Sequence, residues 1–197
     1  MKTKKIGLFF GSFNPIHIGH LILANYIVEF SDLDELWFVV SPHSPFKDKK
    51  SLLEDHHRLD MVQQAIAEYP KMRASNVEFS LPKPSYTVDT LAYLHEKHPS
   101  YSFSLIMGED NLKGLSKWKN ASHIVENYQI IVYPRLSDEK QSHSPSEISS
   151  MISLIDAPII EISATEIRRM IKEGKNVRPM LPPEVYDYLE GSSFYKS

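Results

Sequence analysis

Short apolar runs alternate with helix-like stretches along this chain, and this alternation most constrains its fold. The first run, residues 6–10, is continuously apolar, as expected of a strand that is buried on both faces. It leads through a small-residue turn into a helix-like stretch at 18–30, and the same order then repeats. Strands that alternate with helices pair in parallel through right-handed crossovers. The sequence therefore predicts an α/β fold: a Rossmann-like, doubly wound, mainly parallel sheet flanked by helices.

The other expected elements continue this pattern to the end of the chain. Further strands are expected at 35–40, 102–107, 129–133 and 155–162, with an extended stretch at 72–79. Further helices are expected at 53–69, 87–98, 118–126, 164–173 (closed by Gly174) and 183–189. The Ser-rich segment 136–150 is interpreted as a surface loop or a weak helix, because strands and helices resume after it. We therefore expect residues 1–197 to form a single domain.

The composition excludes several classes of protein. The 197 residues carry a net charge of −3 and contain no cysteine. The charge argues against a general nucleic-acid-binding surface, and the absence of cysteine rules out disulfides and thiolate metal sites. No segment approaches the ~20 apolar residues of a membrane span, and the apolar run near the start is too short for a secretory signal. We expect a cytoplasmic protein without nucleic-acid or membrane partners; the sequence leaves open whether it forms a homo-oligomer.

The segment between the first strand and the first helix has the features of a phosphate site. It reads Gly-Ser-Phe-Asn-Pro-Ile-His-Ile-Gly-His over residues 11–20. Backbone N–H groups and the positive end of a helix dipole converge on an anion at such a turn. Its two histidines, His17 and His20, are three residues apart and share one side of the first helical turn. Two other interpretations are that they only cap and pack the helix, or that they bind zinc, which would require a third ligand that no spacing offers.

A second candidate phosphate site lies far along the chain, at the start of the helix expected at 164–173. Ser163 or Thr165 can cap this helix, whose N–H groups then await an anion. Arg168 lies about one turn inside and carries a planar, permanently charged fork that suits phosphate. The alternative is an ordinary capped helix with a surface arginine.

Both segments resemble signatures of the nucleotidylyltransferase superfamily. Gly-Ser-Phe-Asn-Pro-Ile-His-x-Gly-His is similar to the motif whose two histidines face the α-phosphate of a nucleotide, and Ile-Ser-Ala-Thr-Glu-Ile-Arg is similar to the Ile-Ser-Ser-Thr-x-x-Arg motif. Ala164 replaces the usual second serine of the latter, which puts one side-chain contact to phosphate in doubt. The resemblance implies catalytic roles for His17 and His20. It also implies ATP- and phosphate-binding roles for residues at both motifs, namely Gly11, Ser12, Phe13, Ser163, Thr165 and Arg168.

The middle of the chain narrows the resemblance to the bacterial nicotinate-nucleotide adenylyltransferases. Three segments carry it: the Pro-rich, Lys-containing stretch 42–47, the Ser-Tyr-Thr-x-Asp-Thr-Leu stretch 85–91, and the Gly-x-Asp-x-Leu stretch 108–112 followed by Trp118. Together with the end motifs they cover roughly residues 4–190. The resemblance implies a single nucleotidylyltransferase domain.

Each middle motif has an expected task and a plainer alternative. Thr87 would present its hydroxyl and N–H to the carboxylate of nicotinate, and Trp118 would stack on the pyridine ring; the alternatives are a helix cap and a core tryptophan. Asp110, with Gly108, would bind ribose hydroxyls, or would merely cap a helix. Lys47 would reach phosphate, although most loop lysines are only solvated. Arg135 resembles a family arginine near the nucleotide.

The implied reaction transfers the adenylyl group of ATP to nicotinate mononucleotide, with release of pyrophosphate, in NAD biosynthesis. The attacking phosphate is already an anion, so catalysis is chiefly positioning and charge stabilisation. Mg²⁺ is expected as the cofactor, held by the ATP phosphates and water and not by a protein metal site. Alternatives are the same reaction on nicotinamide mononucleotide, a pantetheine-phosphate adenylyltransferase, and a nucleotide-binding sensor without turnover.

Overall fold

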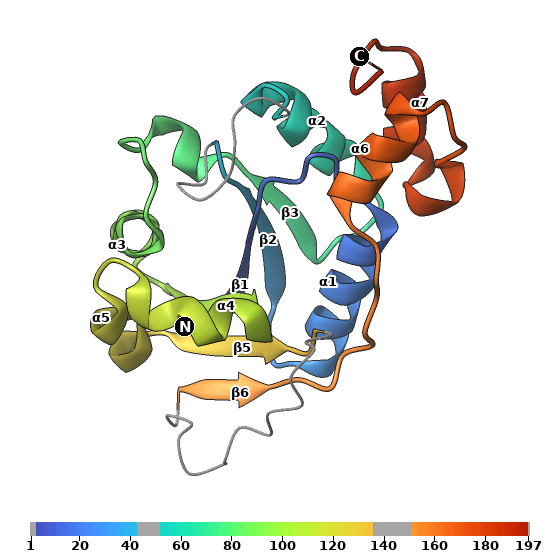
Figure 1. Ribbon diagram of the computed structural model, residues 1–197. Helices are drawn as coiled ribbons and strands as arrows, with labels where there is room; N and C mark the ends of the chain where they lie inside the picture. Colours follow the sequence, from blue (N-terminus) through green and yellow to red (C-terminus); the bar gives the residue numbers. More distant parts are fainter. Residues whose placement is uncertain (1–2, 43–51, 136–150, 197) are drawn as a thin grey trace.

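One parallel sheet forms the centre of the molecule in the computed structural model, which describes residues 3–42, 52–135 and 151–196 (Figure 1). Within these residues the sheet has six strands in the order β3-β2-β1-β4-β5-β6, and each neighbouring pair is parallel. This is the order of a doubly wound Rossmann-like sheet, so the predicted fold is confirmed. The strands are β1 (Lys4–Gly11), β2 (Glu35–Val40), β3 (Met72–Ser75), β4 (Tyr101–Gly108), β5 (Gln129–Tyr133) and β6 (Ile152–Leu154).

Helices cover both faces of the sheet (Figure 1). One face carries α1 (Ile18–Phe30), α2 (Asp55–Ala65), α6 (Ala164–Lys172) and α7 (Pro183–Glu190). The other carries α3 (Thr87–Lys97), α4 (Glu109–Gly114) and α5 (Ala121–Asn127). In the described parts of the chain, none of these helices has the length and apolar character required to cross a membrane.

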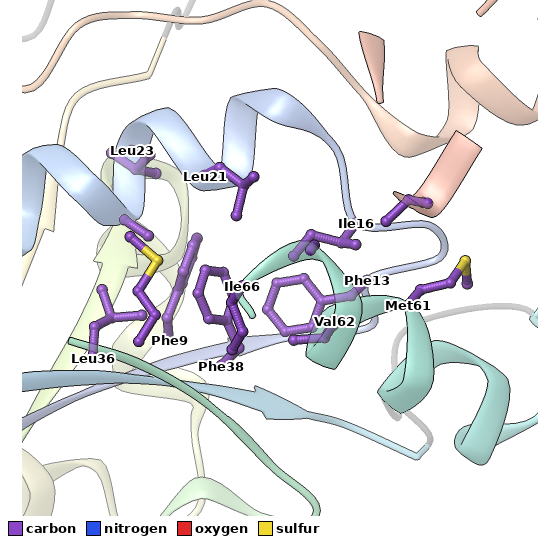
Figure 2. Close-up of a cluster of buried hydrophobic side chains, with 14 of the residues drawn as sticks. Phe9, Phe13, Ile16, Leu21, Leu23, Leu36, Phe38, Met61, Val62 and Ile66 are labelled. Atoms are coloured by element: carbon purple, nitrogen blue, oxygen red, sulfur yellow. The ribbon is translucent and has the colours of Figure 1, made fainter. Parts of the chain in front are cut away.

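The strands divide their side chains between two buried clusters. In β2, Leu36 and Phe38 belong to the cluster beneath α1 and α2, whereas Val39 belongs to the cluster beneath α3 and α5. Figure 2 shows the first cluster, in which Phe9 and Phe13 pack beside Phe38. Successive strand residues point to opposite faces, so burial on both faces explains why the strands are continuously apolar in the sequence.

Two of the predicted elements are wrong in position. The strand expected at 155–162 is absent from these described residues; the last strand is instead β6, and Ile155 adds only one further N–H bond, to the carbonyl of Val132. Pro158 has no N–H to give to a strand ladder, and its neighbours alternate irregularly between buried and exposed. The helix expected from Trp118 begins only at Ala121, because Asn120 has a left-handed backbone with φ 52°.

Several other boundaries agree with the sequence. Helix α1 and strands β2 and β5 have the expected ends. Gly174 follows α6 with φ 66°, a left-handed conformation that glycine adopts without strain. The helix expected at 53–69 is shorter, since α2 covers only Asp55–Ala65.

The strand order reverses between β1 and β4, which are hydrogen-bonded neighbours. Ligands of doubly wound sheets bind outside the carboxyl ends of the strands at this switch point. The segments that leave β1 and β4 there are the turn at 12–17 and the start of α4. The fold therefore brings together the first histidine motif and the Gly-x-Asp motif, although about 90 residues separate them in the sequence.

Candidate active site

The turn after β1 is built around a buried aromatic ring. Phe13 is 2% exposed and has a left-handed backbone with φ 44°, which is strained for a bulky residue. Its ring lies over Gly11, where an added Cβ would approach the ring Cζ to 2.7 Å. Glycine at this position is therefore a packing requirement, and it lets the turn close against the end of β1.

His17 and His20 form a stacked pair at the start of α1. His17 is the N-cap residue, and the two ring centroids are 3.7 Å apart with an interplanar angle of 26°. The backbone N–H of His17 donates to Nδ1 of His20 at 3.3 Å. Because that nitrogen accepts, the proton of a neutral His20 lies on Nε2, which is then a donor. Gly19 allows this arrangement, since a Cβ there would lie 3.1 Å from Nδ1 of His17.

His17 is neutral at physiological pH. Its side chain is 5% exposed, and burial, followed by the positive charge of Arg135, lowers the pKa of His17 to about 4. Protonation in this position would place a second cation beside Arg135 in a poorly hydrated site. The pair can thus donate hydrogen bonds to an anion without first carrying a buried charge.

Helix α6 brings the second motif to the same turn. The guanidinium of Arg168 donates from Nη1 to the carbonyl of Asn14 at 2.8 Å and from Nη2 to Oγ1 of Thr165 at 3.3 Å. Of the two expected caps, Ser163 is the one that caps the helix: its hydroxyl accepts from the N–H of Glu166 at 3.2 Å. Residues 154 positions apart are therefore in direct contact, as the two phosphate motifs require.

A third side of the site comes from the ends of β4 and β5. Asp110, in the first turn of α4, pairs with Arg135, which follows β5, at 3.3 Å. Gly108 lies beneath this pair, and a Cβ there would approach Oδ1 of Asp110 to 2.4 Å and Cδ of Arg135 to 2.7 Å. Both charged side chains are about half exposed (54% and 51%) and so remain accessible to a ligand.

The segments of Thr87 and Trp118 contact each other. Thr87 is the first residue of α3, as the sequence predicts, and Trp118 is partly buried after the 3₁₀ turn Leu115–Lys117. Nζ of Lys119 lies 2.8 Å from Oδ2 of Asp89 and 4.8 Å from the centroid of the Tyr86 ring. These contacts join the start of α3 to the tryptophan segment. Trp118 also lines a cavity of about 630 Å³ with Leu115, Ala121 and Val125.

The structure adds two residues that the sequence did not single out. Arg58 of α2 is completely buried and donates to the carbonyls of Ser12 at 2.6 Å, Ser41 at 2.8 Å and Leu53 at 2.9 Å. Tyr195 donates to the side-chain oxygen of Asn14 at 2.5 Å. The signal for Arg58 was its position on the apolar face of α2, three and four residues before the buried Met61 and Val62. Tyr195 had no comparable signal. Lys47 lies outside the described residues.

The charge of the site suits an anion. Arg135 and Arg168 flank two imidazoles and the N-terminus of α1. In the part of the chain that the structure describes, no group of three or more His, Asp or Glu side chains could hold a metal ion. The positive charge and the imidazoles at the switch point make this edge of the sheet suited to an anion.

Comparison with known proteins gives this geometry a family. A protein-family model described as Cytidylyltransferase-like matches residues 8–170. A Flavobacterium johnsoniae protein named "Probable nicotinate-nucleotide adenylyltransferase" is 57% identical over 194 residues, which cover 98% of this chain and 99% of that protein. The chain belongs to the nicotinate-nucleotide adenylyltransferase family. A Bacteroides fragilis member of the same name is 47% identical, over 94% of this chain and 91% of its own length.

A solved structure with the same fold extends the family likeness. The Plasmodium falciparum nicotinic acid mononucleotide adenylyltransferase complexed with NaAD superposes with a TM-score of 0.81, covering 98% of this chain and 97% of that one. The sequences are 24% identical, so this likeness concerns the fold. It supports the doubly wound architecture along nearly the whole chain.

Proposed function

We propose that this family member transfers the adenylyl group of ATP to nicotinate mononucleotide, giving nicotinate adenine dinucleotide and pyrophosphate in NAD biosynthesis. The observation that carries the proposal is the contact of Arg168 with the carbonyl of Asn14, which joins the helix start at Ser163 to the turn of the paired histidines. ATP and nicotinate mononucleotide are the partners. We infer that the chain acts as one domain in the cytoplasm.

The transfer is a single in-line displacement at the α-phosphorus of ATP. A phosphate oxygen of nicotinate mononucleotide forms a bond to the α-phosphorus. The bond between the α-phosphorus and the oxygen that bridges it to the β-phosphate breaks, and pyrophosphate leaves with the electron pair of that bond. Nε2–H of His20 and the neutral imidazole of His17 stabilise charge on the α-phosphate. Arg168 and the N-terminus of α6 hold the β- and γ-phosphates.

Mg²⁺ fits this site as a companion of ATP. In this proposal the arginine and imidazole groups described above contact the triphosphate. Mg²⁺ would therefore be held by phosphate oxygens and water. When bound, Mg²⁺ neutralises part of the triphosphate charge. The protein residues themselves orient that triphosphate.

In this proposal nicotinate mononucleotide, the acceptor, binds between α3 and the segment around Trp118. The backbone N–H and the hydroxyl of Thr87 suit a carboxylate, because the first turn of a helix carries partial positive charge. Trp118 supplies a partly exposed aromatic surface for the pyridine ring. Asp110 accepts hydrogen bonds from ribose hydroxyls beside Arg135. Lys47 completes the phosphate contacts in this proposal.

Pyrophosphate release tests the function directly. The wild-type chain is mixed with ATP, Mg²⁺ and one acceptor at a time: nicotinate mononucleotide, nicotinamide mononucleotide, pantetheine phosphate or none. We expect release with the acid mononucleotide and a kcat/KM for the amide that is at least ~10-fold lower, about the effect of one lost charge-assisted contact. Equal rates with acid and amide would overturn the assignment of substrate. If no acceptor gives any pyrophosphate release, a nucleotide-binding sensor without turnover would be favoured.

A further inference from the structure

The last residues of the chain fold back onto the carboxyl edge of the sheet. After α7, the hydroxyl of Ser192 donates to the carbonyl of Leu189 at 2.8 Å and accepts from the N–H of Phe194 at 3.1 Å. The ring of Phe194 packs on that of His57 in α2, with centroids 4.6 Å apart. Figure 1 shows this end of the chain next to α2 and α7. The segment is thus held in one position by contacts of its own.

This position delivers one polar atom to the phosphate turn. The hydroxyl of Tyr195 donates to Oδ1 of Asn14 at 2.5 Å, and Asn14 is 3% exposed. Burial raises the pKa of the Tyr195 phenol well above its usual value, so it stays protonated and remains a donor. The backbone of Tyr195 has φ 62°, a left-handed conformation that is strained for an aromatic residue. The fold keeps this contact in spite of the strain.

Asn14 is the junction through which this contact reaches the reacting groups. Its Oδ1 also accepts from the N–H of Leu53 at 3.2 Å, and its carbonyl accepts from Arg168. Three residues later His17 begins α1. Movement of Asn14 would therefore shift Arg168 and the first imidazole together.

We propose that Tyr195 is a positioning residue of the adenylyl transfer: its hydroxyl holds Asn14 so that Arg168 and the histidine pair meet the triphosphate in one fixed arrangement. The inference rests on the proposed function for the reaction concerned, but the bracing of the turn is a property of the protein alone. Misplacement of reacting groups by about 1 Å is enough to slow a reaction ~100-fold. A lost brace therefore has a measurable effect on kcat.

The matched pair Tyr195→Phe and Tyr188→Phe tests this role. Each variant removes one hydroxyl from the same end of the chain, but the partners of the Tyr188 hydroxyl are Nδ1 of His57, at 2.8 Å, and Asp60, both in α2. We expect Tyr195→Phe to lower kcat ~10-fold or more with a KM for ATP within about 3-fold, and Tyr188→Phe to leave kcat within about 2-fold. Hydrogen exchange in residues 11–20 of the free protein should become faster only in Tyr195→Phe.

A second route removes the same hydrogen bond from its other side. Asn14→Ala deletes the acceptor but keeps the carbonyl that Arg168 contacts. In this background, Tyr195→Phe should change kcat by less than about 2-fold, because the interaction is already absent. A full additional loss would show that Tyr195 acts elsewhere and would overturn the proposal.

The outcomes separate this inference from the proposed function. If the wild type turns over and Tyr195→Phe matches Tyr188→Phe in both kcat and exchange, the positioning role is wrong. If the wild type releases no pyrophosphate with any acceptor, the proposed function fails instead. Hydrogen exchange at residues 11–20 would then still test whether Tyr195 holds the turn. Faster exchange in Tyr195→Phe would support this role, and unchanged exchange would overturn it.

Discussion

The two imidazoles at the start of α1 differ in their surroundings and therefore in their parts in the proposed function. His17 is buried beside Arg135 and neutral, whereas His20 is partly exposed and has its Nδ1 occupied by the backbone of His17. This bond fixes the tautomer of a neutral His20, with its proton on Nε2. The stacked pair thus acts as a preorganised donor set.

Removal of either imidazole should affect turnover more than ATP binding. We expect His17→Ala and His20→Ala each to lower kcat by ~10²- to 10³-fold, as does loss of a donor that acts on developing charge. The KM for ATP should change by less than about 10-fold. His123→Ala on the exposed side of α5 serves as the control and should behave as wild type. Near-normal kcat in either active-site variant would refute the role.

The lowered pKa of His17 also predicts a loss of stability in mild acid. Its pKa is about 4 in the folded protein, against 6.5 for a histidine in an unfolded chain, so the unfolded chain binds the proton first as the pH falls. The stabilising effect is complete above pH 6.5 and is lost progressively towards pH 4. At pH 5 the loss is about 2 kcal/mol.

Urea unfolding of the wild type and His17→Gln between pH 8 and pH 5 measures this effect. The difference in unfolding free energy between the two proteins should change by about 2 kcal/mol over this range, at the expense of the wild type. An NMR titration of the His17 ring should have its midpoint near pH 4. A midpoint near 6.5 would contradict the burial argument.

Among individual residues, the sequence predicts the positions of those that belong to local patterns. His17, His20 and Ser163 stand at fixed spacings beside helix starts, and the structure places them there. The contacts of Arg58 and Tyr195 are with carbonyls or side chains of distant loops. No local spacing encodes which loop carbonyl a buried arginine will meet, so only the folded structure reveals these roles.

Among the elements, the ends of α6 were easier to predict than the last strand, whereas the short helix α4 was not predicted. The start of α6 is marked by a Ser cap and its end by Gly174 with a positive φ, so both ends have a local chemical cause. Strand β6 depends on a partner strand, and its three residues pair with Ile130, Ile131 and Val132 of β5. Apolar composition at 155–162 indicated a strand but not where pairing would stop.

The contact between α6 and the turn after β1 can be tested with neighbouring arginines. Arg168→Lys keeps the charge but loses the fork that spans the carbonyl of Asn14 and Oγ1 of Thr165. We expect kcat/KM for ATP to fall ~10-fold or more, measured by pyrophosphate release. Arg169→Lys is the control, because Arg169 pairs only at the exposed surface of α6 with Glu166 and Glu173, and it should change kcat/KM by less than about 2-fold. Equal effects would show that Arg168 has no special position.

In the whole molecule, the strand order determines where the site can be. Alternating strands and helices made the doubly wound architecture predictable, whereas the order β3-β2-β1-β4-β5-β6 comes from the structure. The reversal between β1 and β4 then brings three distant motifs to one edge. Loop geometry at that edge was not predictable, because it depends on a buried cation that links segments from several parts of the chain.

That cation is Arg58, and its replacement should weaken the molecule as a whole. The guanidinium bonds the carbonyls of Ser12, Ser41 and Leu53 and pairs with Asp55 at 2.6 Å. Arg58→Met keeps much of the side-chain volume but leaves the carboxylate and the carbonyls without this donor. Loss of one partner of a fully buried pair costs about 3–5 kcal/mol; because the side chain of Asp55 is 29% exposed, we expect the free energy of unfolding to fall by about 3 kcal/mol.

Thermal unfolding of Arg58→Met should therefore have a midpoint temperature roughly 10 °C lower than that of the wild type. Urea unfolding should likewise have a lower midpoint concentration. Arg169→Met removes an arginine of equal charge from exposed ion pairs and should leave the midpoint temperature close to that of the wild type. Since Ser12 precedes the histidine pair by only a few residues, Arg58→Met should also speed hydrogen exchange at 11–20. Equal stability of the two variants would mean that the turn, the end of β2 and the segment before α2 hold together without Arg58.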